Sequence, residues 1–200
     1  MSLLDLSNVI KLQTFPHKEL RMLEIYLTDL QAYNEGHLVG KWVELPLTPF
    51  ELSQAISEVL TEGEIYSGSD GHEEYFITDY SWQDIEFFST IDEYENLYEL
   101  NKSLQAIEEV EESKHKAIAF LLAEGLATSV EDAIGKAEDV RIYENQTMGD
   151  VAYELMQDCY SADALPSIIS NHIDYEGIAR DLEIDGNYFE VGADIYEYVG

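Results

Sequence analysis

Positive charge is scarce in this chain of 200 residues, which has 10 Lys and Arg against 42 Asp and Glu and a formal net charge of −32. No Lys or Arg occurs from Trp42 to Asn101, and a second such stretch runs from Ile142 to Ala179. Nucleic acids and anionic membranes are bound by clusters of Lys and Arg, so direct binding to either is excluded. The predicted partner is a basic surface, and the most basic clefts in a cell hold DNA or RNA.

Cysteine is also rare, since Cys159 is the only one, and an intrachain disulfide is therefore excluded. Cys159 follows Val151, Ala152 and Leu155 at helical spacing. This pattern predicts a small buried side chain on an apolar helix face rather than a catalytic thiol.

Long apolar runs are absent. The longest, Ala117 to Ala123, is far too short to span a bilayer. The first residues lack the basic region of a signal peptide, and Asp5 interrupts their apolar pattern. We therefore expect a soluble cytoplasmic protein, in which the sequon at Asn145 has no role in glycosylation.

Motifs for catalysis or metal binding are missing as well. The 5 histidines form no metal-spaced set, no phosphate-binding glycine loop occurs, and no nucleophile has a base beside it in the sequence. Asp181 to Gly186 matches the first half of a calcium-binding EF-hand loop, but Gly192 occupies the position that requires a bidentate Glu. A turn at Asp185-Gly186-Asn187 accounts for these residues better. We expect no catalytic residue, no metal and no cofactor.

The sequence nevertheless contains enough apolar residues to form a core. Its hydrophobic fraction is 46% and its aromatic fraction 12%, which distinguishes it from acidic disordered chains. Repulsion among the carboxylates favours an elongated shape. A net charge of ~2–8 suffices for the solubility of a small domain, so solubility alone does not explain −32; adaptation to high salt is an alternative. At one charge per ~1.7 Å, this charge corresponds to roughly 54 Å of DNA duplex, or about 16 base pairs.

The predicted fold class is α+β, an elongated chain of three small domains that follow an N-terminal extension at residues 1–20. The first domain, residues 21–88, has strands at 23–28, 38–45 and 74–80 and a helix opened by the capping box Thr48–Glu51. A polar loop is expected from Gly63 to Gly71.

The second domain, residues 89–138, is predicted to be a helical bundle. Its helices start at a capping box at Thr90–Glu93, near Ser113, and at Ser129, and the second of them ends at Gly125. The third domain, residues 139–200, is again α+β. Its expected strands lie at 140–143, 188–191 and 195–199, and its helices start near Thr147 and Tyr175.

Many of the 14 tyrosines adjoin a carboxylate, as in Glu74-Tyr75, Tyr94-Glu95 and Tyr98-Glu99. Such tyrosines commonly line the edge of a core, with the ring buried and the hydroxyl in water. Alternatively, exposed rings add apolar and hydrogen-bonding contacts with a charged target cleft.

Three blocks of the sequence resemble the ArdA family of antirestriction proteins. The opening block consists of Tyr26–Leu30 (YLTDL), Tyr33–Trp42 (YNEGHLVGKW) and Leu45-Pro46, the second of Glu73–Tyr80 (EEYFITDY), and the closing block of Asn171–Leu182 (NHIDYEGIARDL) with Gly186, Tyr188, Phe189 and Tyr196. The match covers roughly residues 22–200, while the central helices match only in character.

The resemblance implies a DNA mimic, carried by mobile elements or phages, that occupies the DNA-binding cleft of type I restriction–modification enzymes. It also implies three small domains in a curved chain and a homodimer formed through the C-terminal domain. Such a dimer would match roughly 109 Å of duplex, about 32 base pairs.

Carboxylates of the first cation-free stretch are the candidates for replacing phosphates. They are Glu62, Glu64, Asp70, Glu73, Glu74, Asp79, Asp84, Glu86, Asp92, Glu93, Glu95 and Glu99. Two other functions remain open at this point: an acidic inhibitor of another nucleic-acid-handling defence complex, and a metal-dependent enzyme.

Overall fold

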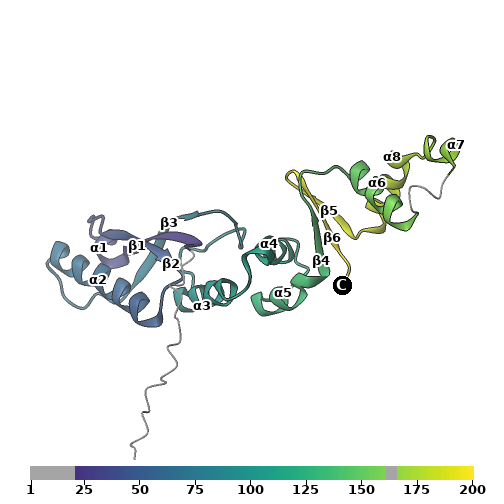
Figure 1. Ribbon diagram of the computed structural model, residues 1–200. Helices are drawn as coiled ribbons and strands as arrows, with labels where there is room; N and C mark the ends of the chain where they lie inside the picture. The colour runs from purple at the N-terminus through teal and green to yellow at the C-terminus, as the bar shows by residue number, and fades with distance from the viewer. Residues whose placement is uncertain (1–20, 161–165) are drawn as a thin grey trace, which may run out of the picture.

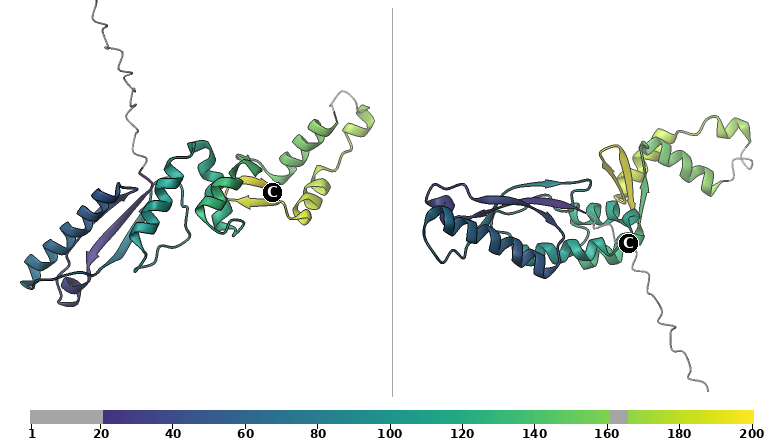
Figure 2. Two further views of the ribbon diagram at one scale, coloured as in Figure 1. Left: turned by 90° about the horizontal axis from the view of Figure 1, so that it is seen from below. Right: turned by 60° about the vertical axis from the view of Figure 1, so that its left-hand side comes forward.

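Two small antiparallel sheets joined by helices make up the computed structural model, which describes residues 21–160 and 166–200. The elements follow one another along a single long axis, with the first sheet at one end and the C-terminal helices at the other (Figures 1 and 2). The α+β class is therefore confirmed. The bounds of the three domains remain a prediction, and the expected extension at residues 1–20 lies outside the described residues.

The first sheet, sheet A, has the order β2-β1-β3, so the first strand in sequence lies in the middle. It consists of β1 (Leu23–Asp29), β2 (Gly40–Leu45) and β3 (Tyr75–Trp82). Both neighbours run antiparallel to β1, and a bulge interrupts the β1–β3 pairing between Tyr26 and Leu27. All three strands were predicted from the sequence, with bounds that differ from the observed ones by one or two residues.

Helix α2 (Pro49–Ser67) packs against β1 and β2. Its capping box forms as expected: the Thr48 hydroxyl accepts from the Glu51 backbone, and the Glu51 carboxylate accepts from the Thr48 backbone. The helix continues through Gly63, where a loop was predicted, and ends at Gly68 with φ +72°. A short helix, α1 (Leu30–Asn34), was also missed; its N-terminus is capped by the Asp29 side chain.

The predicted helix start at Thr90–Glu93 is wrong. Residues 91–96 are not helical and contain a turn at Glu93-Tyr94. Helix α3 (Leu97–Glu108) begins directly after Asn96, whose side chain accepts from two backbone N–H groups. The reason is tertiary, since the Glu93 carbonyl accepts a hydrogen bond from Ile77 N in β3 at 2.8 Å. The segment is thereby held against the sheet and cannot coil into a helix.

The middle of the chain is helical, as predicted. It contains α4 (His115–Ala123) and α5 (Val130–Lys136), with short 3₁₀ turns η1 (Glu112–Lys114) and η2 (Ala137–Asp139). Gly125 adopts φ +66° after α4, and the Ser129 side chain caps α5 by accepting from Asp132 N.

Sheet B, the second sheet, has the order β4-β6-β5 and is made of β4 (Val140–Tyr143), β5 (Tyr188–Val191) and β6 (Asp194–Tyr198). The three remaining helices are α6 (Met148–Cys159), α7 (Ser167–Ser170) and α8 (Tyr175–Asp185). The turn expected at Asp185-Gly186-Asn187 lies between α8 and β5. Gly186 ends α8 with φ +79°, and the β5–β6 hairpin turns at Gly192.

Alternating residues of β6 give sheet B two buried faces. Tyr196 stacks on Phe120 of α4 with ring centroids 4.6 Å apart, and it belongs to a core that runs without interruption from β1. Ile195 points the other way and packs with Val151, Ala152 and Ala179 in a second, smaller core under α6 and α8. Sheet B is therefore the layer that joins the C-terminal helices to the rest of the molecule.

Cys159 is exposed, which corrects the expectation of a buried side chain. Helix α6 buries Met148, Val151 and Ala152 near its N-terminus, whereas its last turn lies beyond the packed part of the helix. Within the described ranges, no helix is long and apolar enough to cross a membrane.

Asn101 supplies a testable constraint, because this buried amide holds the loop before α2. Its side chain accepts from Leu47 N and donates to Leu47 O, both at 2.7 Å. Asn101→Ala would leave Leu47 N unpaired, while Leu47 O would keep its hydrogen bond from Gln105 Nε2, and we expect the free energy of unfolding to fall by about 1–3 kcal/mol. Chemical denaturation measures this loss. The exposed neighbour Lys102→Ala is the control, and equal stability of the two variants would refute the role.

Candidate functional site: the acidic surface

The twelve candidate carboxylates all lie on or near the surface, as the shortage of cations predicted. All are exposed except Glu64 and Glu95, which are half-buried. Of the twelve, Glu99 alone forms an ion pair with another described residue, Lys102, and that contact is long at 3.8 Å.

A first group surrounds the C-terminal end of α2 and the loop that leads to β3. It consists of Glu62, Glu64, Asp70, Glu73 and Glu74. Glu64 has a structural role, since its carboxylate accepts from Gly71 N at 2.7 Å and His72 N at 3.2 Å. The other four have no ion-pair partner in the part of the chain that the structure describes, so their charge faces solvent.

A second group follows β3 and the turns up to α3. It consists of Asp79, Asp84, Glu86, Asp92, Glu93, Glu95 and Glu99. Asp79 lies opposite Tyr26 in the sheet, and Asp92 accepts from Tyr94 N at 2.9 Å. The structure therefore spreads the twelve residues over the loop after α2, sheet A and the start of α3, and it does not bring them into one cluster.

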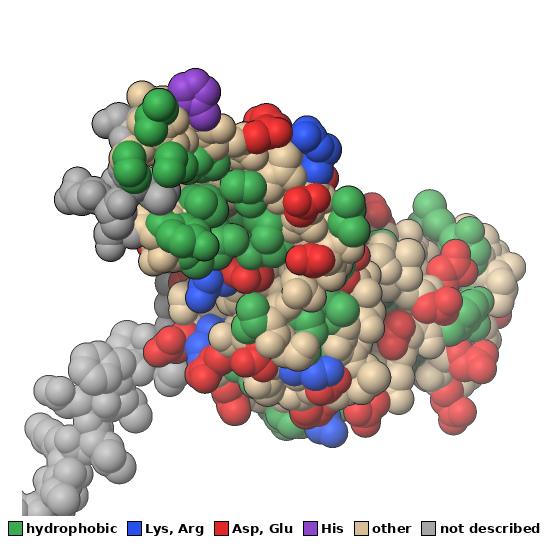
Figure 3. Space-filling model, turned by 90° about the vertical axis from the view of Figure 1, so that its right-hand side faces the viewer, with side chains coloured by type: hydrophobic (Ala, Val, Ile, Leu, Met, Phe, Trp, Pro, Cys, Tyr) green, Lys and Arg blue, Asp and Glu red, His purple; other side chains and the backbone are tan. Residues whose placement is uncertain are grey.

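Apart from Lys102, the cations of the described residues pair with carboxylates outside the candidate set and mostly join separate elements. Lys41 of β2 pairs with Glu58 of α2, and Arg21 pairs with Glu44 at 2.7 Å. These contacts leave the candidate carboxylates uncompensated. The space-filling view shows the outcome on one face, where Asp and Glu outnumber Lys and Arg (Figure 3).

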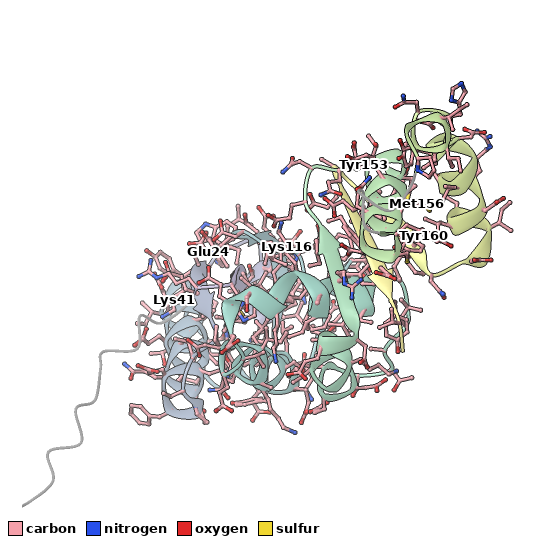
Figure 4. The ribbon with its side chains drawn as sticks, turned by 45° about the vertical axis from the view of Figure 1, so that its right-hand side comes forward. Glu24, Lys41, Lys116, Tyr153, Met156 and Tyr160 are labelled. Carbon is pink, nitrogen blue, oxygen red and sulfur yellow. The ribbon has the colours of Figure 1, made fainter. Side chains whose placement is uncertain are left out.

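Among the described residues, Lys116 of α4 is the cation that pairs with two carboxylates. Its Nζ contacts Glu144 at 2.7 Å and Asp194 at 3.2 Å, and these two hydrogen bonds raise its pKa above the usual value. Asp194 also accepts from Asn145 N at 2.9 Å. This junction links α4 to the loop after β4 and to the start of β6; Figure 4 labels Lys116 beside sheet B.

A buried polar network was missed in the sequence. Asp29 and His72 have fully buried side chains, and His72 Nδ1 lies 2.7 Å from the Asp29 carboxylate. His72 Nε2 lies 3.1 Å from the Ser67 hydroxyl and 3.0 Å from that of Ser69. A Cβ on Gly63 would lie 2.2 Å from Asp29 Oδ2, so Gly63 is the residue that makes room for the pair.

This network has the order acid–base–hydroxyl found in serine hydrolases. However, the imidazole is fully enclosed and Nε2 is shared between two hydroxyls, which leaves it no contact with a substrate. Its evident effect is to fasten the loop after α2 to the end of β1. No short motif could have revealed it, because Asp29 and His72 are 43 residues apart.

The residues of the EF-hand half-motif lie on a helix. Asp181 to Asp185 form the last part of α8, and a helix cannot wrap them around an ion. In the described ranges, no group of three or more His, Cys, Asp or Glu could hold a metal.

A second surface feature is apolar and lies over α6 and α7. Tyr153, Tyr160, Ile168 and Ile169 are exposed there, and we call them the C-terminal apolar surface. Figure 3 shows hydrophobic side chains gathered over this end of the molecule. Tyr153 and Met156 lie three residues apart on α6, and Tyr160 follows the last residue of the helix (Figure 4). Tyr153 and Met156 therefore share one side of the helix.

A family model described as Antirestriction protein (ArdA) matches residues 25–197 of the chain. The chain belongs to the ArdA family. Among curated proteins, no sequence matches it significantly. The resemblance noted in the three sequence blocks is thereby confirmed, and the family is one of inhibitor proteins rather than a known enzyme family.

The tyrosines of this ArdA protein are of two kinds: some line the edge of the core, and others have exposed rings. Tyr75, Tyr80 and Tyr196 pack against the core, whereas Tyr94 and Tyr98 are exposed beside carboxylates. Burial raises the pKa of the Tyr75 and Tyr196 hydroxyls, so these side chains are neutral at ordinary pH.

The Asp194 junction of this ArdA protein gives a pH prediction. The hydrogen bond from Asn145, together with Lys116, lowers the pKa of Asp194 below its usual value. A lowered carboxyl pKa contributes stability above the unfolded-state value of about 3.9 and loses it as pH falls through the folded-state value. Asp194→Asn should therefore lower the melting temperature by roughly 1–3 °C near pH 7. This difference should begin to shrink near pH 4 and vanish only once the pH has fallen through the lowered folded-state pKa of Asp194.

Thermal denaturation over a pH series measures this difference. The control is Asp181→Asn, an exposed carboxylate without an ion pair among the described residues. Removing this carboxylate only reduces repulsion, so the melting temperature of the Asp181→Asn variant should equal or exceed that of the parent protein. A pH-independent loss in Asp194→Asn would contradict the electrostatic explanation.

Proposed function

We propose that this ArdA protein is a DNA mimic that occupies the DNA-binding cleft of type I restriction–modification enzymes. The observation that carries the proposal is the outward-facing, uncompensated charge of the stretch between Lys41 and Lys102. Its carboxylates take the place of phosphates against the Lys and Arg of the cleft. Inhibition then requires occupancy alone and no chemistry by this chain.

The physical basis is the same as for DNA binding by those enzymes. Cations that line a DNA cleft are compensated by phosphates when DNA is bound and by small ions when it is not. Carboxylates on a folded scaffold release these ions in the same way, and their long-range field accelerates association. The elongated arrangement of the elements is consistent with a partner shaped to hold a length of duplex (Figure 1).

We also propose that two copies associate through the C-terminal apolar surface. Like-charged chains repel, so an interface is favoured where apolar side chains are dense and carboxylates are few. Tyr153, Tyr160, Ile168 and Ile169 provide such an area at the end of the molecule farthest from sheet A (Figures 1 and 3). A dimer formed there doubles the length of the acidic surface.

The central experiment is displacement of a labelled DNA duplex from a purified type I methyltransferase core. We expect competitive displacement, with an apparent affinity that falls at least about tenfold between 50 and 200 mM salt. Failure to displace DNA at low salt would refute the proposal. Capture of a different nucleic-acid-handling complex from a host lysate would then favour the alternative target.

Charge reversal of one cluster tests which carboxylates matter. The variant in which lysine replaces all four of Glu62, Asp70, Glu73 and Glu74 should displace DNA about thirtyfold or more weakly. The attraction of this cluster to the basic cleft becomes repulsion. Each single substitution should change it by less than about threefold.

The matched control places four lysines at Glu124, Asp181, Glu183 and Glu190, which are exposed and lie outside the candidate stretch. It has the same net charge as the cluster variant. Equal loss of displacement in both would show that net charge, rather than the candidate stretch, determines binding.

The dimer prediction uses two isoleucines of similar exposure. Ile168, in the C-terminal apolar surface, is 77% exposed, and Ile65 on α2 is 74% exposed. Ile168→Glu should convert the dimer to a single chain in analytical ultracentrifugation, because it places a charge in an apolar interface. Ile65→Glu should remain dimeric. A parent protein that sediments as a single chain at micromolar concentration would refute the interface.

A further inference from the structure

The two faces of sheet A are covered very differently. Helix α2 lies along one face, where Leu23, Ile25 and Leu27 are fully buried. The other face carries Glu24, Tyr26 and Thr28 of β1, and no long helix of the described chain lies over it (Figure 2). Figure 4 labels Glu24 on this sheet. A sheet face without a covering helix is a place where a partner can bind.

This open face contains a groove of about 370 Å³, which we call the sheet A groove. It is lined by Tyr26, Thr28, Tyr33, Leu38, Phe76, Thr78 and Glu93. Three separate segments form it: sheet A itself, the stretch from α1 to β2, and the turn before α3.

Aromatic rings line part of the groove and continue beyond its wall. Tyr33 meets Phe76 edge-on with ring centroids 5.2 Å apart, and Tyr94 stacks on Phe76 at 6.2 Å. On the other side, Tyr26 meets Trp42 edge-on at 5.3 Å. Tyr33, Trp42 and Tyr94 are the exposed members of these ring pairs.

The groove is held in shape by local contacts. The Tyr26 hydroxyl donates to the Gly40 carbonyl at 3.0 Å, and the Thr28 and Thr78 hydroxyls lie 2.8 Å apart. A Cβ on Gly40 would lie 2.8 Å from the Tyr26 ring and 2.6 Å from the Leu27 carbonyl. Glycine at this position lets the tyrosine ring lie against the strand.

Side chains at the rim are exposed although they are large and apolar. Leu38 is 84% exposed and Tyr94 65%, and Tyr33 and Trp42 are about half exposed. Single exposed apolar residues are ordinary, but a contiguous set around a groove is typical of a binding site.

The charged side chains around the groove that lack an ion-pair partner among the described residues are carboxylates. Glu93 lines it, Asp79 and Glu24 lie on the same face, and none of the three forms an ion pair with a described residue. Two cations of this part of the described chain are already engaged, Arg21 with Glu44 and Lys41 with Glu58 of α2. A cation that enters the groove therefore meets aromatic faces and free carboxylates together.

We propose that the sheet A groove binds an arginine side chain from the DNA-binding cleft of the target enzyme; this rests on the proposed function. A guanidinium group is planar and weakly hydrated, so it stacks on aromatic rings while its N–H groups donate to carboxylates. Its aliphatic stem fits against an apolar residue such as Leu38. The groove thus adds a localised anchor to a binding energy that is otherwise spread over many weak charge contacts.

Dissociation kinetics separate this anchor from the general field. Tyr33→Ala and Tyr94→Ala leave the net charge unchanged, so the association rate with the methyltransferase core should stay within about twofold. The dissociation rate should rise about tenfold for each variant.

Tyr66→Ala is the matched control, because Tyr66 is 61% exposed on α2 and outside the groove. It should dissociate as the parent protein does. Thermal denaturation confirms that each variant is folded. Dissociation of both groove variants at the control's rate would overturn the inference.

A direct probe is the peptide Gly-Arg-Gly-Arg-Gly, compared with Gly-Lys-Gly-Lys-Gly at low salt. In a Trp82→Phe background, the fluorescence of Trp42 reports on the groove alone. We expect saturable binding of the arginine peptide at least about fivefold tighter than that of the lysine peptide, lost in Glu93→Gln with Tyr94→Ala. Equal affinity for the two peptides would contradict recognition of a guanidinium group.

The outcomes for the two proposals are distinguishable. If the parent protein displaces DNA and the groove variants displace it equally well with unchanged dissociation rates, the groove inference fails while the DNA-mimic proposal stands. If the parent protein does not displace DNA but still prefers the arginine peptide, the target is wrong and the groove specificity stands. Relief of self-association by the groove variants would show instead that a second copy occupies the groove.

Discussion

Repulsion among unpaired carboxylates is the constraint on which the rest of this structure depends. With a net charge of −32, the chain can fold only if its apolar core offsets the repulsion and its few cations are placed where they matter most. The cations connect different elements: Lys41 joins β2 to α2, Lys114 joins η1 to η2, and Lys116 joins α4 to sheet B. Cations used for cohesion in this way are unavailable to neutralise the outer surface.

Local sequence signals predicted most of the elements because their causes are local. The capping boxes at Thr48 and Thr147 form between residues three apart, and strand alternation depends only on burial of one sheet face. The box at Thr90–Glu93 has the same residue types but fails, because Glu93 bonds to β3. The predicted burial of Cys159 was wrong for a related reason. Helical spacing shows which side of α6 the residue lies on, but it does not show how far along the helix the packed part extends.

The candidate site was predictable only in part. Exposure of the acidic residues follows from composition, since 42 carboxylates cannot be paired with 10 cations. The sheet A groove and the Asp29–His72 network could not be predicted, because both depend on contacts between distant segments. Tyr33, Phe76 and Tyr94 meet only because β3 pairs with β1 and the turn before α3 folds back on the sheet.

The position of Tyr196 has a consequence for how this protein meets a partner. Its ring lies in a core that begins at β1, while the adjacent Ile195 belongs to the core under α6 and α8. Flexing the molecule at sheet B would separate stacked aromatic rings on one side or aliphatic side chains on the other. The described chain therefore resists bending at sheet B. Under the DNA-mimic proposal, little conformational entropy of this chain would be lost on docking into a cleft.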